Sequence, residues 1–172
     1  MAEHTFTLMI RGPVEDQLDR LYDVGCDDAT FGEVDGVQYA EFSREAANFT
    51  HAVASAIRDV ESVDGLRVIH VEPEDLVTAA EIAERLGRSR ESIRLLIAGE
   101  RGDGDFPAPV SHLRARNRLW RWSDVAEWAD VISTEDMIYA RFLAAVNGAL
   151  EMRNQSEQLP EHDRDLLAGI LS

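Results

Sequence analysis

The stretch TAAEIAERLGRSRESIRLLIA occupies residues 78–98 and predicts two short helices joined by a tight turn. Thr78 and Glu81 have the spacing of a capping box, in which each side chain satisfies a free backbone N–H at a helix start. Gly87 permits the left-handed backbone of a turn, and Ser89 can cap a second helix over residues 89–98, which ends near Gly99. The apolar residues that would form a core shared by both helices are Ile82, Leu86, Ile93 and Leu96, and Ala83 is small where the helices would cross closely.

The segment that follows is rich in arginine and aromatic residues. FPAPV at residues 106–110 leads into SHLRARNRLWRW at residues 111–122, and the next residues, SDVAEW, predict a short helix capped by Ser123. Arg114, Arg116 and Arg118 occupy every second position, so a strand through them places all three on one face. RGDGD at residues 101–105 looks like an insertion, and its aspartates would repel a phosphate that they faced.

Four pieces of this region occur together: the LGRSR turn, the FPAPV entry, the arginine-rich hairpin and the WSDVAEW helix. They closely resemble the winged helix-turn-helix of the MerR, excisionase and AlpA type, over residues 77–129. The resemblance implies a recognition helix in the major groove of DNA, a wing that contacts phosphates or the minor groove, and Trp122, Val125 and Trp128 in the core. The candidate DNA-binding residues are Ser89, Arg90, Ser92 and Arg94 on the helix and Arg114, Arg116, Arg118 and Arg121 on the wing.

The residue types agree in part with this interpretation. Arg90 and Arg94 are four positions apart and therefore share a helical face. An arginine can donate two hydrogen bonds to guanine, while Ser89 and a helix N-terminus suit a phosphate. Two alternatives stay open: the arginines form a solvated surface that pairs with the acidic N-terminal segment, and the tryptophans pack in a core rather than stack on bases.

Residues 4–72 predict the element order β-α-β-β-α-β. Residues 5–11 alternate as a strand, a helix follows Pro13, and Asp35-Gly36 joins two strands as a hairpin in which Val34 pairs with Val37. A second helix and a strand over residues 66–72 complete the set. This order resembles the ferredoxin-like fold, including the ACT-type regulatory modules built on it. The expected helix stripes are Val14, Leu18, Leu21 and Tyr22 in the first helix, and Phe49, Val53, Ile57 and Val60 in the second.

The hairpin also predicts two different sheet faces. Ala29, Phe31, Ala40 and Phe42 share the face expected to be buried, whereas Met9, Val34, Val37 and Tyr39 share the open face. An apolar open face would normally seek a partner, although scattered apolar side chains are also ordinary on protein surfaces.

Residues 131–172 predict a helical extension. Its stripe consists of Ile138, Phe142, Ala145, Val146 and Ala149, and a short tail carries Leu166, Leu167, Ile170 and Leu171. The stripe either forms a dimer seam or packs back on its own domain. One winged helix-turn-helix buries only ~600–1,000 Å² against DNA, so we expect a homodimer, joined through this stripe or through the open sheet face.

The composition narrows the class of protein. The chain has 172 residues, one cysteine, a formal net charge of −16, and arginine at all 17 Lys+Arg positions. The lack of lysine excludes Schiff-base and phosphate-loop lysine chemistry, and the single cysteine excludes an intramolecular disulfide. The five histidines lack metal-ligand spacing and no nucleophile has an evident base, so we expect no enzyme, cofactor or metal site.

The distribution of charge and hydropathy adds two expectations. Residues 78–128 hold 9 basic and 8 acidic residues, whereas residues 1–77 hold 5 basic and 17 acidic ones, so the segments serve different purposes. No apolar run approaches ~18 residues and no secretory signal opens the chain. We therefore expect a cytoplasmic, nucleoid-associated protein without a membrane partner.

These observations predict an α+β protein with a ferredoxin-like domain at residues 1–73, a winged helix-turn-helix at 74–130 and a helical extension at 131–172. The leading hypothesis is a sequence-specific, dimeric bacterial transcriptional regulator that binds double-stranded DNA. Its acidic N-terminal domain would dimerise or bind a protein or small-molecule effector. The alternative is an acidic protein-interaction adaptor or antitoxin-like inhibitor, in which DNA binding is secondary.

Overall fold

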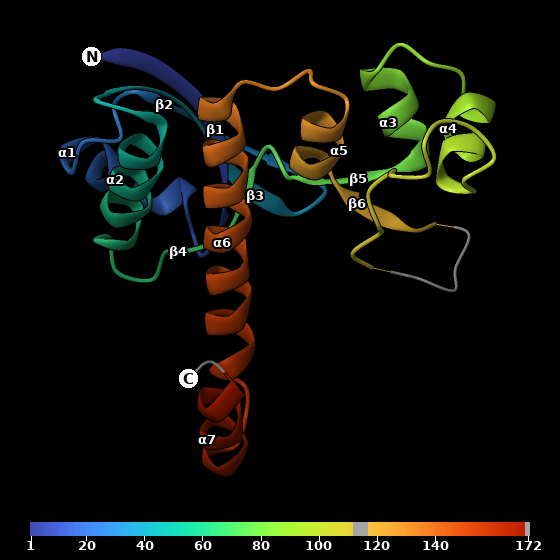
Figure 1. Cartoon of the computed structure of the whole chain (residues 1–172). Helices are drawn as coiled ribbons and strands as arrows, with labels where there is room; N and C mark the ends of the chain where they lie inside the picture. Colours follow the sequence, from blue (N-terminus) through green and yellow to red (C-terminus); the bar gives the residue numbers. More distant parts are fainter. Residues whose placement is uncertain (112–116, 171–172) are drawn as a thin grey trace. The chain divides into compact units, whose positions relative to one another are not determined.

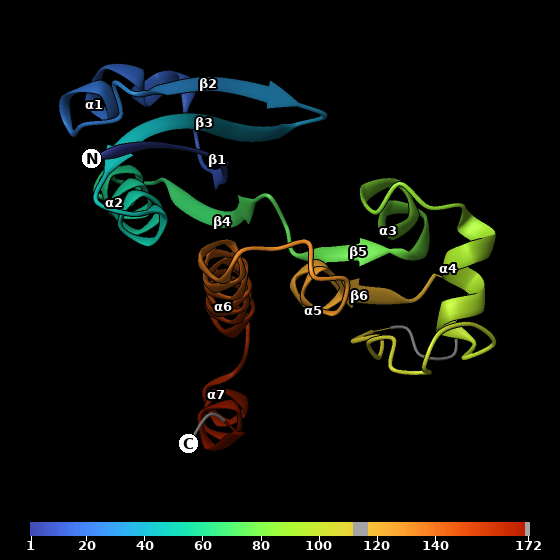
Figure 2. The ribbon, with the colours of Figure 1, turned by 45° about the horizontal axis from the view of Figure 1, so that its top comes forward.

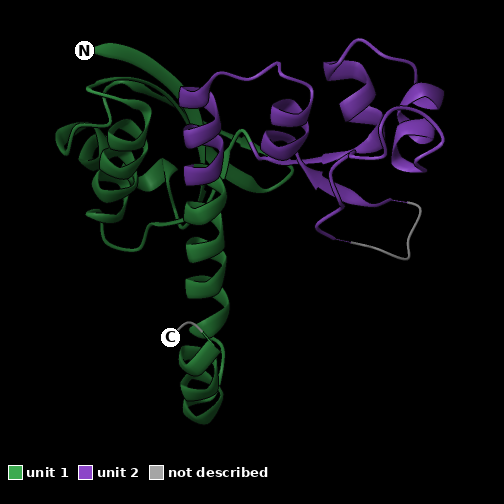
Figure 3. Ribbon diagram, in the orientation of Figure 1, with its two compact units in different colours: residues 1–73, 143–172 green, residues 74–142 purple. Residues whose placement is uncertain are grey.

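The computed structural model describes residues 1–111 and 117–170, which form a mixed α+β protein (Figure 1). Two compact units divide it: residues 1–73 and 143–172 form unit 1, and residues 74–142 form unit 2 (Figure 3). The first unit boundary falls after Pro73. Residues 131–172 do not form a third unit, because residues 131–142 belong to unit 2 and the rest to unit 1.

Unit 1 contains one four-stranded antiparallel sheet. Its strands are β1 (Ala2–Arg11), β2 (Ala29–Val34), β3 (Val37–Ala46) and β4 (Arg67–Glu72), in the spatial order β2-β3-β1-β4 (Figure 2). A 3₁₀ turn (Glu15–Gln17) and α1 (Leu18–Asp23) follow β1, and α2 (Phe49–Glu61) follows β3. Within residues 1–73 the regular elements therefore follow the order expected from the sequence.

The β2–β3 hairpin has the expected turn and register. Asp35 and Gly36 both have positive φ, 52° and 80°, as the two central residues of a type I′ turn require. Val34 pairs with Val37, and this register places Phe42 and Ala40 on the buried face. Val34 and Val37 are exposed, as expected for the open face.

The two helices of residues 1–73 differ in how well the apolar stripe predicts burial. In α2, Phe49, Val53 and Val60 are buried as expected. In the first helical segment only Val14 and Leu21 are buried, whereas Leu18 and Tyr22 are exposed, so that part of the prediction is wrong. The physical reason is that a 3₁₀ turn precedes a helix of only six residues, and its tighter winding breaks the 3.6-residue period.

The C-terminal helix α6 (Thr134–Ser156) covers the edge strand β4 (Figure 2). Asn147 accepts a hydrogen bond from the Val71 N–H at 2.8 Å and donates one to the Val71 C=O at 2.9 Å. Arg153 donates to the Val68 C=O at 2.8 Å and pairs with Glu61, which accepts from the Val68 N–H at 3.0 Å. These side chains satisfy strand groups that a neighbouring strand would otherwise bind.

The buried face of α6 is not the predicted stripe. Leu143, Leu150 and Asn154 are buried, whereas Ile138 is 55% exposed. The physical reason is that α6 contacts β4 through the polar side chains of Asn147 and Arg153, so its apolar residues alone do not mark the contact face. Of the two alternatives for this helix, packing on its own chain applies to residues 143–156. The tail helix α7 (Glu161–Ile170) has no buried residue.

A buried arginine connects α2 with the loop before β2. Arg44 on β3 donates to Asp28 at 2.7 and 3.0 Å, to Asp59 at 2.7 Å, to Ser55 at 3.0 Å and to the Gly25 C=O at 2.6 Å. Burial alone would lower the pKa of Arg44, but its hydrogen bonds and the charges of Asp28 and Asp59 raise that pKa above its ordinary value. Nothing in the sequence pattern predicts this cluster.

Unit 2 combines a two-stranded sheet with short helices. Strand β5 (Leu76–Thr78) pairs antiparallel with β6 (Leu119–Arg121), and the helices are α3 (Ala79–Arg85), α4 (Arg90–Ile97) and α5 (Trp122–Trp128). The buried core consists of Val77, Ile82, Ala83, Ile93, Leu96, Trp120 and Val125. Of the helix residues expected there, Leu86 is only partly buried against it. Trp122 and Trp128 are partly buried against it.

The start of α5 is capped by Asp75, not by Ser123. The Asp75 carboxylate accepts from the Ser123 N–H and from the Ser123 hydroxyl, both at 2.8 Å, and its C=O accepts from the Trp122 N–H. Ser123 is fully buried and lies inside the helix, so its predicted capping role is wrong. The reason is that the carboxylate of Asp75, which directly precedes β5 and is distant in sequence, occupies the position that a local serine would take.

Candidate nucleic-acid interface

The turn between α3 and α4 is set by glycine. Gly87 has φ +61°, its N–H donates to the Glu84 C=O at 3.1 Å, and the Arg88 N–H donates to the Ala83 C=O at 2.8 Å. This pair of bonds closes α3 in a Schellman motif. At the start of the helix, Thr78 and Glu81 form the expected capping box, and hydrogen bonds from Thr78 lower the pKa of Glu81. The prediction of a helix that begins at Thr78 and turns at Gly87 is confirmed.

Helix α4 is likewise fixed at both ends. The Ser89 hydroxyl accepts from the Ser92 N–H at 3.1 Å, which is the expected N-terminal cap. Gly99 has φ +69°, its N–H donates to the Leu96 C=O at 3.1 Å, and the Glu100 N–H donates to the Leu95 C=O at 2.9 Å. Because Ile93 and Leu96 are buried, α4 has a fixed rotation and shows a constant set of side chains to solvent.

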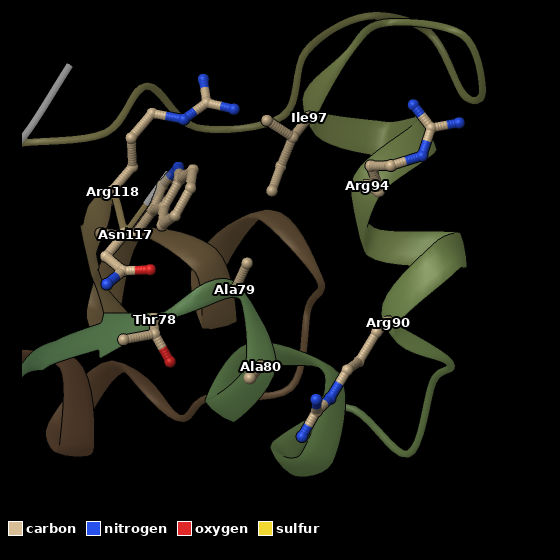
Figure 4. Close-up of a pocket in the computed structure, with 9 residues that line it drawn as sticks. Thr78, Ala79, Ala80, Arg90, Arg94, Ile97, Asn117 and Arg118 are labelled. Atoms are coloured by element: carbon tan, nitrogen blue, oxygen red, sulfur yellow. The ribbon is translucent and has the colours of Figure 1, made fainter. Parts of the chain in front are cut away.

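A cavity of about 500 Å³ opens in unit 2 and is lined mainly by residues of α3, α4 and the segment 117–120 (Figure 4). Three of the predicted residues, Arg90, Arg94 and Arg118, line it together, although Arg118 comes from a different part of the chain. In Figure 4 the Arg90 side chain extends toward Ala80, whereas the Arg94 guanidinium points away from Thr78 and Arg118. The other lining residues are Thr78, Ala79, Ala80, Ile97, Asn117 and Trp120.

The described residues on either side of the predicted wing pair with each other. Val110 donates to the Leu119 C=O at 2.8 Å, and Leu119 donates to the Ser111 C=O at 3.3 Å. Trp120, only 2% exposed, donates from its indole to the Pro107 C=O at 3.0 Å. The Arg118 guanidinium lies 5.5 Å from the centre of the Trp120 ring, within the range of a cation–π contact. For Trp120 the core alternative therefore holds.

The other three predicted wing residues are Arg114, Arg116 and Arg121. Arg114 and Arg116 lie outside the described residues. Arg121 is described, but it does not line the cavity: its guanidinium is 3.9 Å from the buried Asp75 carboxylate. The structure therefore places Arg121 where it balances the charge of the residue that caps α5.

The two serines of the predicted site, Ser89 and Ser92, make hydrogen bonds within unit 2. Ser89 is occupied as a cap, and the Ser92 hydroxyl accepts from Arg101 at 3.4 Å. Arg101 was not among the predicted site residues, because it belongs to the segment that looked like an insertion. The only feature of the sequence that points to Arg101 as a site residue is its positive charge shortly after the predicted recognition helix.

The insertion is tied to the aromatic residues of unit 2. Asp105 accepts from the Trp128 indole N–H at 2.9 Å, and Arg88 lies 5.9 Å from the centre of the Trp128 ring. Asp105 therefore contacts Trp128, a neutral donor that leaves the charge of the carboxylate in place. Arg85 makes a similar contact with the Trp122 ring at 5.0 Å. For both tryptophans, contacts within unit 2 replace the base-stacking alternative.

Arg94 is engaged by acidic neighbours. Its Nε lies 3.0 and 3.1 Å from the two carboxylate oxygens of Glu91, and its Nη2 lies 2.9 Å from Glu91 Oε1 and 3.7 Å from Glu100 Oε2. The hydrogen bonds from Arg94 lower the pKa of Glu91, and the same bonds raise the pKa of Arg94. All three side chains are exposed, so water screens their charges.

Three of the residues that line this cavity are basic. Arg90, Arg94 and Arg118 line it together with the small residues that begin α3. In residues 1–111 and 117–170 no group of three or more His, Cys, Asp or Glu side chains is arranged to hold a metal ion. Across the same residues, no helix has the length and apolar character needed to cross a membrane. Comparison with known proteins adds no assignment: no protein-family model, no curated protein and no solved structure matches the chain.

Proposed function

We propose that unit 2 binds double-stranded DNA sequence-specifically, with α4 in the major groove and the hairpin bearing Arg118 against the phosphate backbone. The observation that carries the proposal is that Arg90, Arg94 and Arg118 line one cavity beside two helices joined at Gly87. An exposed helix of eight residues fits a major groove about 12 Å wide. The helix pair, the paired strands β5 and β6 and the arginine-bearing hairpin support a winged helix-turn-helix.

The proposal extends to the whole chain. The β-α-β-β-α-β order and the sheet order β2-β3-β1-β4 support a ferredoxin-like arrangement for residues 1–73. A DNA-binding unit next to an acidic α+β unit fits a cytoplasmic transcriptional regulator. In this role the acidic unit would dimerise or receive a protein or small-molecule effector.

A second function draws on one specific observation. Arg94 is paired with Glu91 and lies close to Glu100, so part of the basic surface is already neutralised within the chain. This favours an acidic adaptor or antitoxin-like inhibitor that covers a basic partner. The two functions differ in one property, because only the first requires duplex binding that depends on Arg90 and Arg118.

The test measures binding to labelled duplexes by fluorescence anisotropy at several salt concentrations. We expect R90A to weaken binding to the preferred site by ~1–3 kcal/mol and to relax its base preference. We expect R118A to weaken binding to all duplexes alike and to lower the log–log salt slope by about one.

The matched control is R58A, which removes one exposed arginine from α2 in unit 1 and should leave both quantities unchanged. If R90A and R118A behaved like R58A, or if the wild-type chain bound no duplex at low salt, the DNA-binding proposal would be wrong and the adaptor function would take its place.

A further inference from the structure

Arg94 meets Glu91 through one edge of its guanidinium group. The carboxylate of Glu91 accepts from Nε and from Nη2, at 2.9–3.1 Å, which is the side-on geometry of an arginine–carboxylate pair. An arginine has five N–H donors in a rigid plane, so a side-on pair uses one N–H of Nη2 and leaves the other. Both N–H groups of Nη1 have no hydrogen bond to any atom in residues 1–111 and 117–170.

The remaining edge has a defined chemical use. Nη1 and Nη2 together present two parallel N–H donors at the end of the side chain. The O6 and N7 atoms of guanine accept such a pair in the major groove, and this is the commonest specific contact between arginine and a base. Arg94 points outward from α4, on the side chain row that it shares with Arg90 (Figure 4).

We propose that Glu91 is a positioning residue that turns Arg94 into an end-on reader of guanine. The inference rests on the DNA-binding function proposed above and adds a residue that sets its specificity. Glu91 sits three positions before Arg94 on the same helix, so it moves with α4 and fixes the plane of the guanidinium before DNA arrives. A free arginine would instead distribute its donors between bases and phosphates.

Charge and stability argue that the role of Glu91 is selectivity. A carboxylate near DNA repels phosphates, so Glu91 lowers the affinity for every duplex. An exposed ion pair of this kind contributes little to folding, although an acidic residue does favour the first turn of a helix. Glu91 therefore contributes to selectivity by orienting Arg94, and it lowers the affinity for all duplexes to some extent.

Glu100 provides a natural control for charge alone. Its carboxylate lies 3.7 Å from the same Nη2 atom, which is too long for a hydrogen bond, and it makes no bond to Nε. E100A and E91A therefore remove the same charge from the same guanidinium, but only E91A removes the side-on hydrogen bonds.

The experiment selects binding sites from random duplexes with the full chain, in parallel for the wild type, E91A, E100A, R94A and E91A/R94A. Binding constants are then measured for the selected site and for the same site with its guanine replaced. Circular dichroism confirms that each variant is folded. We expect R94A to lose the preference for one guanine by roughly tenfold or more.

We expect E91A to reduce that same preference roughly 2- to 12-fold, because an unrestrained arginine must be ordered on binding. E91A should also bind unrelated duplexes more tightly than the wild type, as should E100A. E100A should keep the wild-type base preference, and E91A/R94A should equal R94A in preference, because Glu91 acts only through Arg94.

Two results would overturn the inference while DNA binding stands: an unchanged guanine preference in E91A, or an equal loss in E100A and E91A. A specific site whose guanines are unaffected by R94A would overturn it as well. If the wild type selected no site at all, the proposed function itself would fail, and this outcome is distinct from the other three.

Discussion

Replacing Arg44 with methionine removes the cation from the buried cluster of unit 1. Methionine keeps much of the apolar stem of the side chain, so the main change is the loss of the guanidinium and of its bonds to Asp28, Asp59, Ser55 and Gly25. The two aspartates then face each other without a countercharge. We expect R44M to destabilise unit 1 strongly.

The size of the effect follows from how far the aspartates are buried. Breaking a buried ion pair by removing one partner costs ~3–5 kcal/mol. The side chains of Asp28 and Asp59 are 27% and 31% exposed, so water still reaches them and the lower end of the range applies, about 3 kcal/mol. A typical domain has only ~5–15 kcal/mol of stability, so R44M should remain folded but open far more often.

The chain contains separate probes for its two units. All three tryptophans, Trp120, Trp122 and Trp128, lie in unit 2, whereas the buried Cys26 lies in unit 1. The rate at which Cys26 reacts with a thiol reagent therefore reports the opening of unit 1, and tryptophan fluorescence in urea reports unit 2. A loss of about 3 kcal/mol corresponds to a rate increase of roughly 150-fold, since 1.4 kcal/mol is a factor of ten.

Two variants serve as comparisons. R67M removes an exposed arginine paired with Glu157 and should change the thiol rate by less than about fivefold. R44M/D28N/D59N removes the whole charged set and should recover much of the lost protection. The reasoning is refuted if R44M reacts at the wild-type rate, or if neutralising both aspartates gives no recovery.

Two further predictions concern pH and the sheet edge. Burial raises the pKa of Cys26 from 9.0 to about 11, so the unfolded chain releases this proton at a lower pH than the folded chain does. The free energy of unfolding is therefore unaffected by this group below pH 9 and should fall between pH 9 and 11, by at most ~1.4 kcal/mol per pH unit. Urea midpoints of the wild type and C26A should diverge in this window, where the absence of lysine keeps other titrations few; parallel curves would contradict the assignment. N147A removes both bonds to the Val71 backbone and should destabilise unit 1 by ~1–3 kcal/mol in the thiol assay, while Q155A, which loses an exposed contact on the same helix, should not.

Local rules account for the parts of the fold that the sequence predicts correctly. Asp35-Gly36 specifies its hairpin, and Gly87 and Gly99 specify helix ends, because each requires only the backbone of its immediate neighbours. The burial of Val53 and Val60 follows from helical period alone. The wrong predictions involve distant partners: Asp75 replaces Ser123 as a cap because the two residues are 48 positions apart.

The candidate site shows the same division. The shared face of Arg90 and Arg94 follows from their spacing, and both line the cavity. The separation of Arg118 from Arg121 could not be predicted, because it depends on Arg121 lying near Asp75, which directly precedes the partner strand. The pair between Glu91 and Arg94 is allowed by its spacing, yet its side-on geometry requires the positions of the side chains.

The contact between α6 and β4 can form only after a delay during synthesis of the chain. Asn147 follows Val71 by 76 residues, and all of unit 2 is translated between Val71 and residue 143. At roughly 5–20 residues per second, a ribosome needs about 4–15 s to pass from one to the other. Throughout that interval the Val71 N–H and C=O and the Val68 C=O lack their partners from α6 on the nascent chain and are open to pairing with a strand of another molecule. The speed at which residues 74–142 are synthesised therefore sets how long this strand edge lacks its hydrogen-bond partners from α6.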